Sequence, residues 1–242
     1  MNYIFGRKPV VEAIRSGERV DQIYIQYGVK GQPVFDILKL AKERGIRVSE
    51  VSAERFNTMA PGKNTQGVIA VISEINYSDL DEIIFKAKNS EYPLILVLDS
   101  IQDPHNLGAI LRSAECAGAD GVILTKHNSA SVNDTVIKTS AGAASHLSIC
   151  VVNNLAQAMD ILKENGFWIA GSYLDGAKDY TEADYKLPLA LIVGNEEKGI
   201  RRLTAEKCDF LIKIPMKGKI QSLNVSVAAG ILLFEINRQR NQ

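Results

Sequence analysis

Three polar stretches of the sequence contain residue types that could do chemistry. They are 103-DPHNLGAILRSAE-115, 194-GNEEKGIRR-202 and 222-SLN-224. The first stretch predicts a turn and then a helix beginning at Leu107, with Asn106 as its N-cap and one apolar stripe at helical spacing. At about 100° per residue, Arg112 falls on roughly the opposite face from that stripe. Arg112 is therefore either an ordinary solvated charge or a cation that the turn presents to a ligand.

The other two stretches also allow two interpretations each. The glutamates of 194–202 favour the first turn of a helix, and its lysine and arginines suit a solvated face or contacts to a phosphate backbone. Ser222 and Asn224 precede a segment in which positions 225–234 hold only one polar side chain, Ser226. Such a helix is buried in the core or in an oligomer interface. Ser222 and Asn224 would either cap it or help to hold a small-molecule ligand at its start.

Several common chemistries are disfavoured by the sequence. No G-x-G-x-x-G follows a strand and no G-x-x-x-x-G-K-[ST] occurs, which argues against dinucleotide binding on a Rossmann fold and against phosphate-loop hydrolysis. The three histidines lie in separate segments and do not form a metal set. The three cysteines are odd in number and far apart, which predicts a reducing compartment without disulfides or a zinc knuckle. We expect them to pack as small hydrophobic residues.

The bulk composition predicts a globular protein. The chain has 242 residues, of which 46% are hydrophobic and 23% charged, and its formal net charge is zero. Residues 1–75 carry 11 Lys+Arg against 8 Asp+Glu, a weak basic bias that is compatible with RNA binding. No apolar run approaches the roughly 18 residues needed to span a bilayer, and the start lacks the features of a signal peptide. We expect a cytoplasmic protein.

Helix and strand patterns alternate in the front segment. Helices are predicted over 7–17, 34–45 and 53–60, and strands over 20–26, 46–51 and 68–73. The segment 78-SDLDEIIFKAKNSEYP-93 is typical of a charged helix that ends in turn residues, and we interpret it as the joint between two units. We therefore expect an N-terminal α/β unit at 1–74, a linker helix at 75–92 and a second domain at 93–242.

Apolar strands separated by helical stretches follow, which predicts a parallel sheet covered by helices on both faces. The strands are expected at 94–99, 122–125, 148–152, 167–173, 189–194 and 210–215. In such sheets the ligand crevice lies beyond the carboxyl ends of the strands. Polar and glycine residues are richest at those ends, in 99-DSIQDPHN-106, 171-GSYLDGA-177, 194-GNEEKGI-200 and 215-PMKGKIQSLN-224.

Three segments taken together resemble the motifs of one family. The segments are 103-DPHNLGAILRSAECAGADGVIL-124, 189-LALIVGNEEKGIRRL-203 and 212-IKIPMKGKIQSLNVSVAAGILLFE-235. In order and separation they are similar to motifs 1, 2 and 3 of the SPOUT-class (SpoU/TrmH) RNA ribose 2′-O-methyltransferases. The resemblance covers 92–240 and is nearest to RlmB-like enzymes, which methylate a guanosine of 23S rRNA. It implies an α/β fold with a C-terminal parallel-sheet SPOUT domain, a trefoil knot and a small N-terminal α/β RNA-binding domain.

The resemblance also implies a reaction and a site. S-adenosylmethionine would be the methyl donor, S-adenosylhomocysteine the product and RNA the partner. The enzyme would be a homodimer without a metal, and its site would lie near the subunit interface. The donor pocket would comprise Gly171, Ser172, Gly194, Ile214 and Leu223. The catalytic side would comprise Asn106, Arg112, Glu196, Ser222 and Asn224.

The chemistry suggests a role for Arg112 in such a site. Arginine is a poor general base because its pKa lies above about 12. We hypothesise instead that Arg112 clamps the target phosphate and stabilises charge that develops at the ribose 2′-oxygen. Glu196 and Asn224 would position loops and ribose rather than titrate.

We expect 2′-O-methylation of a ribose in structured RNA, foremost a guanosine of 23S rRNA. The alternatives are a tRNA guanosine 2′-O-methyltransferase and a non-catalytic RNA-binding ribosome-assembly factor; a nicotinamide-dependent enzyme is a distant third. One departure concerns the loop before the strand at 68–73, which commonly contains His-Gln-Gly in RlmB-like proteins. Here it is 65-TQG-67, which weakens the substrate assignment but not the chemistry.

Overall fold

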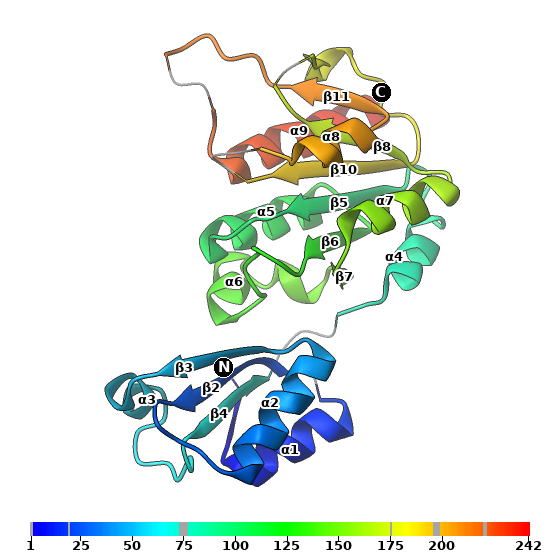
Figure 1. The fold of residues 1–242 in the computed structure, drawn as a ribbon. Helices are drawn as coiled ribbons and strands as arrows, with labels where there is room; N and C mark the ends of the chain where they lie inside the picture. Colours follow the sequence, from blue (N-terminus) through cyan, green and yellow to red (C-terminus); the bar gives the residue numbers. More distant parts are fainter. Residues whose placement is uncertain (1, 19, 73–76, 175, 196–198, 220–221) are drawn as a thin grey trace. The chain divides into compact units, whose positions relative to one another are not determined.

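The protein divides into two compact units, Met1–Glu74 and Ile75–Gln242. The computed structural model describes residues 2–18, 20–72, 77–174, 176–195, 199–219 and 222–242. Each unit has a sheet and apolar cores of its own (Figure 1). Within the described residues, no helix has the length and apolar character that a membrane span requires.

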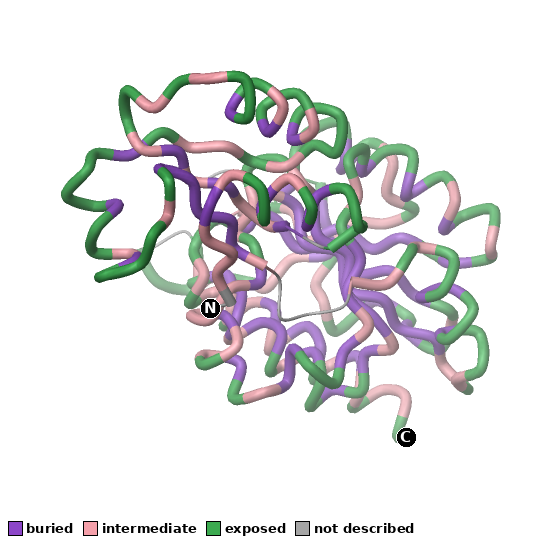
Figure 2. Tube along the Cα trace, turned by 90° about the horizontal axis from the view of Figure 1, so that it is seen from below, coloured by how far each residue is buried: buried purple, intermediate pink, exposed green. Residues whose placement is uncertain are grey.

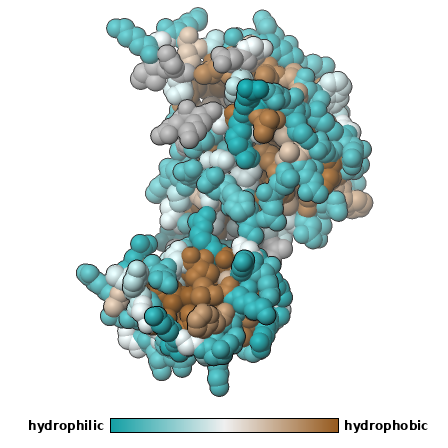
Figure 3. Space-filling view, viewed as in Figure 1, coloured by the Kyte–Doolittle hydropathy of each residue, from teal (hydrophilic) through white to brown (hydrophobic). Residues whose placement is uncertain are grey.

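The smaller unit is a mixed sheet with helices on both faces. Its elements are β1 (Asn2–Phe5), α1 (Arg7–Ser16), β2 (Val20–Gln26), α2 (Gln32–Arg44), β3 (Arg47–Val51), α3 (Ala53–Met59) and β4 (Val68–Ile72). The described strands have the order β1-β4-β2-β3, in which only β2 and β3 are parallel. Along β4, Val68 and Ala70 pack with α1 and α2, while Ile69 packs with Phe56 of α3. In Figure 3 hydrophilic side chains surround one apolar area of this unit.

The expected elements of the smaller unit are confirmed, and one strand is new. Gly17 and Gly45 adopt left-handed conformations where α1 and α2 end, as their place after the helical patterns predicts. The strand β1 has no counterpart in the sequence expectation. Four residues are too few for a recognisable alternation, and its pairing with β4 is what makes it a strand.

The larger unit is a parallel sheet between two helical layers, as expected. Its strands are β5 (Leu94–Asp99), β6 (Gly121–Thr125), β7 (Ile149–Val152), β8 (Trp168–Ser172), β9 (Lys178–Asp179), β10 (Leu189–Gly194) and β11 (Phe210–Lys213). Its helices are α4 (Leu80–Ala87), α5 (Pro104–Cys116), α6 (Asp134–Thr139), α7 (Leu155–Glu164), α8 (Arg202–Lys207) and α9 (Val225–Arg240). The described strands have the order β7-β6-β5-β10-β8-β11-β9, and all their pairings are parallel.

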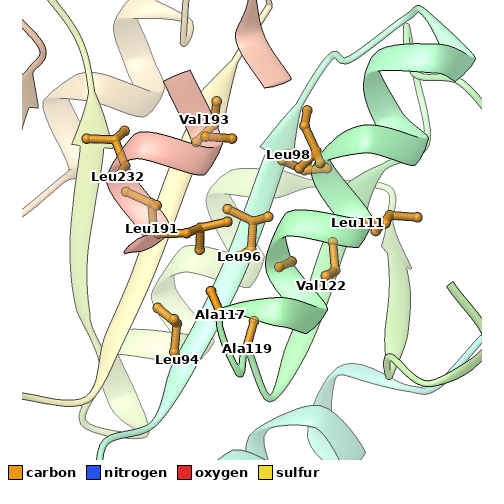
Figure 4. Packing of buried hydrophobic residues seen from close by; sticks show 14 of the residues in the cluster. Leu94, Leu96, Leu98, Leu111, Ala117, Ala119, Val122, Leu191, Val193 and Leu232 are labelled. Carbon is orange, nitrogen blue, oxygen red and sulfur yellow. The ribbon is translucent and has the colours of Figure 1, made fainter. Parts of the chain in front are cut away.

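Alternating side chains of the central strands supply two cores. Leu94, Leu96 and Leu98 of β5 pack with α5 and α9, whereas Ile95 and Val97 pack with α4 and α7. Figure 4 shows the first core, with leucines of β5 and β10 pointing toward α5 and α9. The sheet is therefore the buried centre of this unit, as the purple strands in Figure 2 show.

The helix α4 belongs to the larger unit by its contacts. Asp79 and Glu82 form a capping box at its start, and Ile83 and Ile84 are buried against the sheet. The segment 78–93 was expected to be a charged helix that ends in turn residues, and turns do follow Ala87.

The strand order predicts a ligand crevice beside the end of β5. The chain leaves β5 toward β6 on one side, and β10 occupies the other side. Strand ends that diverge in this way leave room for a ligand at the carboxyl edge. Asp99 and Gly194, the last residues of β5 and β10, are paired in register there. The threading of a trefoil knot stays a prediction.

Candidate active site

The carboxyl ends of four neighbouring strands bring the predicted donor-pocket residues to one edge. β5, β10, β8 and β11 are adjacent and parallel, so their carboxyl ends share that edge. Gly171 and Ser172 end β8, Gly194 ends β10, and Ile214 follows β11. Ile214 and Leu223 are both half-buried.

The start of α5 differs from the sequence expectation. The N-cap is Asp103, whose carboxylate accepts a hydrogen bond of 3.0 Å from the His105 backbone N–H. The helix begins at Pro104, whose fixed φ and missing N–H suit a first helical position. The prediction that Asn106 caps a helix starting at Leu107 was therefore wrong. Asn106 lies within the first turn, where its side chain is available for a tertiary contact.

That contact is made by Asn224, the residue at the start of α9. Asn224 caps α9 because its Oδ1 accepts a hydrogen bond of 2.9 Å from the Ser226 backbone N–H. Its Nδ2 donates a hydrogen bond of 3.0 Å to Oδ1 of Asn106. One side chain thus both caps a helix and joins the first and third polar stretches of the sequence. Ser222 is exposed nearby in the chain, and Glu196 lies outside the described residues.

Arg112 lies on the exposed side of α5, as its spacing predicted. Leu107, Ile110, Leu111 and Ala114 form the buried stripe. Within the described residues the Arg112 guanidinium makes no ion pair. Six positions separate Arg112 from Asn106, which at helical geometry is about 9 Å along the axis and about 120° around it. The two side chains therefore do not share a face of α5 within one chain.

A buried carboxylate that the sequence interpretation did not single out lies at the centre of this edge. Asp99 is only 1% exposed. Its Oδ1 lies 3.0 Å from Nη2 of Arg201, and its Oδ2 accepts bonds from Nε of Arg201 at 3.1 Å and from the Thr204 hydroxyl at 3.3 Å. Because a buried charge requires such partners, Asp99 holds the segment after β10 against the end of β5. An acidic residue at the end of an otherwise apolar strand was the available signal.

Further hydrogen bonds hold the segment after β10 near the end of β5. The Asn195 and Gly199 backbones exchange hydrogen bonds of 3.1 and 2.8 Å, and Asn195 Nδ2 donates to the Ser100 carbonyl at 3.3 Å. Ser100 has a φ of +67°, an uncommon value for a residue with a side chain. Its backbone N–H donates to the Thr125 hydroxyl at 3.1 Å, which helps to hold this conformation.

Close packing within the chain requires glycine at two of the predicted pocket positions, Gly194 and Gly171. A Cβ on Gly194 would lie 2.2 Å from backbone atoms of Gly199 and Ile200, so the close approach is made by the chain itself. A Cβ on Gly171 would lie 2.7 Å from the Sγ of Cys208. Burial raises the pKa of the Cys208 thiol from 9.0 to about 12, so this sulfur is a neutral packing group.

Two arginines of the second polar stretch are engaged in ion pairs. Arg201 pairs with Asp99, and Arg202 pairs with Glu206 at 2.8 Å on the surface. Arg201 keeps 61% of its side chain exposed but is held in place. Both guanidinium groups have carboxylate partners and stay exposed, so contact of Arg201 and Arg202 with a phosphate backbone stays a prediction.

The residue types at this edge suit an organic ligand better than a metal ion. At the strand ends the predicted residues offer a half-buried apolar side chain, Ile214, the Ser172 hydroxyl and backbone groups. Among the described residues, no three His, Cys, Asp or Glu side chains come together as metal ligands would. The three cysteines are free thiols.

Comparison with known families matches both units. The model of the SpoU rRNA methylase family matches residues 93–234. The model described as RNA 2′-O ribose methyltransferase substrate binding matches residues 3–78. A protein of Staphylococcus haemolyticus, named for the TrmH family of tRNA/rRNA methyltransferases, is 44% identical over 240 residues, covering 99% of this chain and 96% of the relative.

Solved structures give the same result. The AdoMet-bound rRNA methyltransferase from Sinorhizobium meliloti superposes with a TM-score of 0.64 at 28% identity, covering 98% of this chain and 86% of that one. The SpoU methyltransferase AviRb from Streptomyces viridochromogenes, in complex with the cofactor AdoMet, has a TM-score of 0.64 at 25% identity, covering 99% and 90% of the two chains.

Proposed function

The chain belongs to the SpoU rRNA methylase family, and from that premise we propose that it transfers a methyl group from S-adenosylmethionine to a ribose 2′-oxygen of structured RNA. The observation that carries the proposal is the hydrogen bond between Asn224 and Asn106. It joins two separate polar stretches at the edge of the sheet where a ligand crevice is expected.

The residues at this edge fit S-adenosylmethionine. Ile214 and Leu223 are half-buried apolar side chains that suit the faces of an adenine ring. The Ser172 hydroxyl and the backbone groups beyond β8, β10 and β11 suit its polar rim. Bound S-adenosylmethionine supplies a methyl group that is already activated on a sulfonium sulfur. Gly171, Ser172, Gly194, Ile214 and Leu223 are proposed to form this pocket.

The protein's task is then to orient the ribose hydroxyl and to help its proton leave. We assign the orientation to Asn106 and Asn224, whose amides can exchange hydrogen bonds with ribose oxygens while they hold each other. Ser222 adds a hydroxyl before the same helix. Glu196 is proposed to act in the loop after β10.

Arg112 is proposed to clamp the phosphate of the target nucleotide. Its guanidinium has a planar fork that matches phosphate oxygens, and its exposed position leaves that fork accessible. Its charge would stabilise the negative charge that develops at the 2′-oxygen as the proton departs. Arginine is a poor general base, so the proton of the 2′-hydroxyl would pass to a water molecule and not to Arg112.

A homodimer accounts for the direction in which Arg112 points. Phe234 and Val227 of α9 are 53% and 50% exposed, and the half-buried Ile231 lies between them on the same face. Such an apolar face on a helix suits burial against a second copy. Because α5 and α9 pack together, Arg112 in a dimer would serve the site of the partner subunit.

We propose a guanosine of 23S rRNA as the substrate and a tRNA guanosine as the alternative. The match of residues 3–78 to a substrate-binding family supports an RNA target for the front unit, and the S. meliloti protein is named an rRNA methyltransferase. The tRNA alternative is kept because the staphylococcal relative is named for both RNA classes.

Mapping of 2′-O-methylation in total RNA, with and without the gene, tests the proposal. Loss of one mark in 23S rRNA, restored by the wild-type gene but not by Arg112→Ala, is the expected result. A lost mark in tRNA would establish the alternative. An unchanged methylation map, together with no S-adenosylmethionine binding in calorimetry, would leave a non-catalytic RNA-binding factor.

A further inference from the structure

One edge of the smaller unit gathers three segments that are far apart in the sequence. β1, β2 and β3 end at this edge, and β4 begins there. We call the segments 6–8, 27–31 and 61–67 together the loop edge. Segments 27–31 and 61–67 are exposed over much of their length, and in 6–8 Lys8 is exposed, Arg7 half-buried and Gly6 buried.

Specific contacts hold the loop edge together. The Arg7 backbone N–H donates to Oε1 of Gln66 at 3.2 Å, and its Nε donates to the Gln66 carbonyl at 2.9 Å. A Cβ on Gly31 would lie 3.7 Å from Nη1 of Arg7, and one on Gly67 would lie 2.6 Å from a methyl group of Val29. The three segments therefore form one continuous surface rather than independent loops.

The charge of the loop edge has a single sign. Its segments contain Arg7, Lys8, Lys30 and Lys63 and no Asp or Glu. The remaining segment that leaves this edge, 52–55, adds one acid and one base. By contrast, 17–21 and 43–47, which lead into the strands from the opposite edge, carry both signs.

Helix dipoles reinforce that charge. α1 begins directly after Gly6 and α2 directly after Gly31, so two helices start at this edge. Neither glycine offers a side-chain cap, and each helix N-terminus carries a partial positive charge. The sheet topology therefore adds to the field of the four basic side chains.

An aromatic side chain projects from the same surface. Tyr27 is 74% exposed, although its backbone N–H is fixed by a hydrogen bond of 2.9 Å to the Val51 carbonyl. An exposed aromatic ring on a fixed backbone, on a surface whose charged side chains are all basic, is the arrangement that stacks an unpaired base while basic groups follow the backbone. An acidic protein segment would pair with the basic side chains but would leave the face of the Tyr27 ring without a contact.

We infer that the loop edge binds an unpaired stretch of RNA, with a base stacked on Tyr27 and phosphates near Lys30 and Lys63. The inference rests on the proposed function, because it assigns part of the RNA grip to a surface outside the methyl-transfer site. It also gives a role to 65-TQG-67: Gln66 fastens Arg7, and the Thr65 hydroxyl accepts from the Gly67 backbone N–H at 3.3 Å.

The full-length protein tests the stacking contact by binding to a single-stranded 12-nucleotide oligouridylate and to an RNA duplex of equal length. Tyr27→Ala is expected to weaken oligouridylate binding about tenfold and duplex binding little, while Tyr27→Phe keeps the wild-type affinity. Phe85→Ala is the matched control, because Phe85 is 74% exposed, as Tyr27 is, and lies on α4 of the larger unit. Equal affinities for Tyr27→Ala and Phe85→Ala would overturn the inference.

The lysines are tested by salt dependence. Lys30→Ala and Lys63→Ala together should lower the slope of log affinity against log salt for the oligouridylate by about 1.4. Lys39→Ala and Lys42→Ala on α2 are the matched pair and should leave the slope unchanged. If polyglutamate competes with RNA equally well for wild type and Tyr27→Ala, the surface belongs to an acidic protein instead.

Methyl transfer to deproteinised 23S rRNA separates this inference from the proposed function. If wild type transfers methyl groups and Tyr27→Ala has an unchanged KM for RNA, only the loop-edge inference fails. If wild type transfers none to 23S rRNA or tRNA, the proposed function fails. The expected result is transfer by wild type with an RNA KM raised about tenfold in Tyr27→Ala.

Discussion

The side-chain amide of Asn224 donates a hydrogen bond of 3.0 Å to the side-chain oxygen of Asn106. The two residues are 118 positions apart in sequence. Asn224 also caps α9 through its own oxygen, so the orientation of the helix cap and the link to α5 are set together. A substitution that keeps the cap of α9 but removes the bond to Asn106 shows which of the two methyl transfer requires.

Asn224→Ser is expected to keep the fold and lose the link. Serine caps a helix about as well as asparagine, whereas Asn224→Ala should cost about 1 kcal/mol of unfolding free energy. Neither variant can donate the amide hydrogen bond to Asn106, so both should slow methyl transfer. Denaturant unfolding and single-turnover methylation measure the two effects. The matched control is Asn154→Ser, which changes the cap of α7; a rate for Asn224→Ser equal to that control would disprove the role of the link.

Arg112→Lys is expected to slow methyl transfer while S-adenosylmethionine binding is unchanged. Lysine keeps the charge but cannot form the bidentate contact with phosphate. Removal of one group that stabilises transition-state charge costs about 100-fold in rate. Single-turnover kinetics and calorimetry measure the two quantities. A wild-type rate for Arg112→Lys would exclude the clamp, and a loss of cofactor affinity would reassign the residue to the donor pocket.

Mixed dimers are expected to show on which subunit Arg112 acts. When Arg112→Ala and Asn224→Ala chains are unfolded together and refolded, statistical mixing makes half of the dimers heterodimers. If Arg112 serves the partner's site, each heterodimer has one intact site, and about a quarter of wild-type activity returns. If Arg112 serves its own chain, the mixture stays as inactive as its components.

Asp99→Asn is expected to destabilise the protein by about 2 kcal/mol and to weaken S-adenosylmethionine binding. The amide cannot pair with the Arg201 charge, although that guanidinium is exposed enough to regain water. Glu206→Gln, which breaks the exposed Arg202–Glu206 pair, is the control and should cost less than about 0.5 kcal/mol. Denaturant melts and calorimetry of both variants decide. If the two variants lost equal stability, Asp99 would not be the residue that holds the segment after β10 against β5.

The thiols are expected to differ in their reaction with maleimide. Cys116 is exposed, whereas burial raises the pKa of Cys208 from 9.0 to about 12. Because the thiolate reacts, Cys208 should stay unlabelled in the folded protein at pH 8, and its rate should rise toward pH 12. The folded state favours the neutral thiol, so its contribution to stability is complete below pH 9 and is lost as the pH rises toward 12. Mass spectrometry of peptides identifies the labelled site; rapid labelling of Cys208 at pH 8 would contradict the packing.

Phe234→Asp is expected to convert a dimer into monomers. The charge would be placed on the apolar face of α9 that is proposed to pair with a second copy. Phe85→Asp is the matched control, because Phe85 is exposed on α4 to 74%. Sedimentation velocity should show dimers for wild type and for the control. If Phe234→Asp also remains dimeric, the interface lies elsewhere.

The sequence by itself determined the elements and the residue types at their ends. Helix and strand periods, the glycines after α1 and α2, and the exposed side of α5 follow from local geometry, which acts within a few residues. The family motifs could be recognised for the same reason, since each is a continuous stretch. The strand β1 was missed because four residues are too few to show an alternating pattern. The true cap of α5, Asp103, was missed because Asn106 is also a residue type that caps helices.

Only the tertiary structure decided which polar groups meet. Asp99 and Arg201 are 102 positions apart, and no local pattern relates them. Their pairing exists because β10 lies beside β5 in parallel, which brings two distant strand ends to one edge. Tertiary packing also brings Asn106 to Asn224, so its side chain bonds to another helix and does not cap its own. It places backbone atoms of Gly199 and Ile200 in the space beside Gly194. A sequence lists the groups that can do chemistry, whereas the packing of elements distant along the chain sets which of them lie within bonding distance.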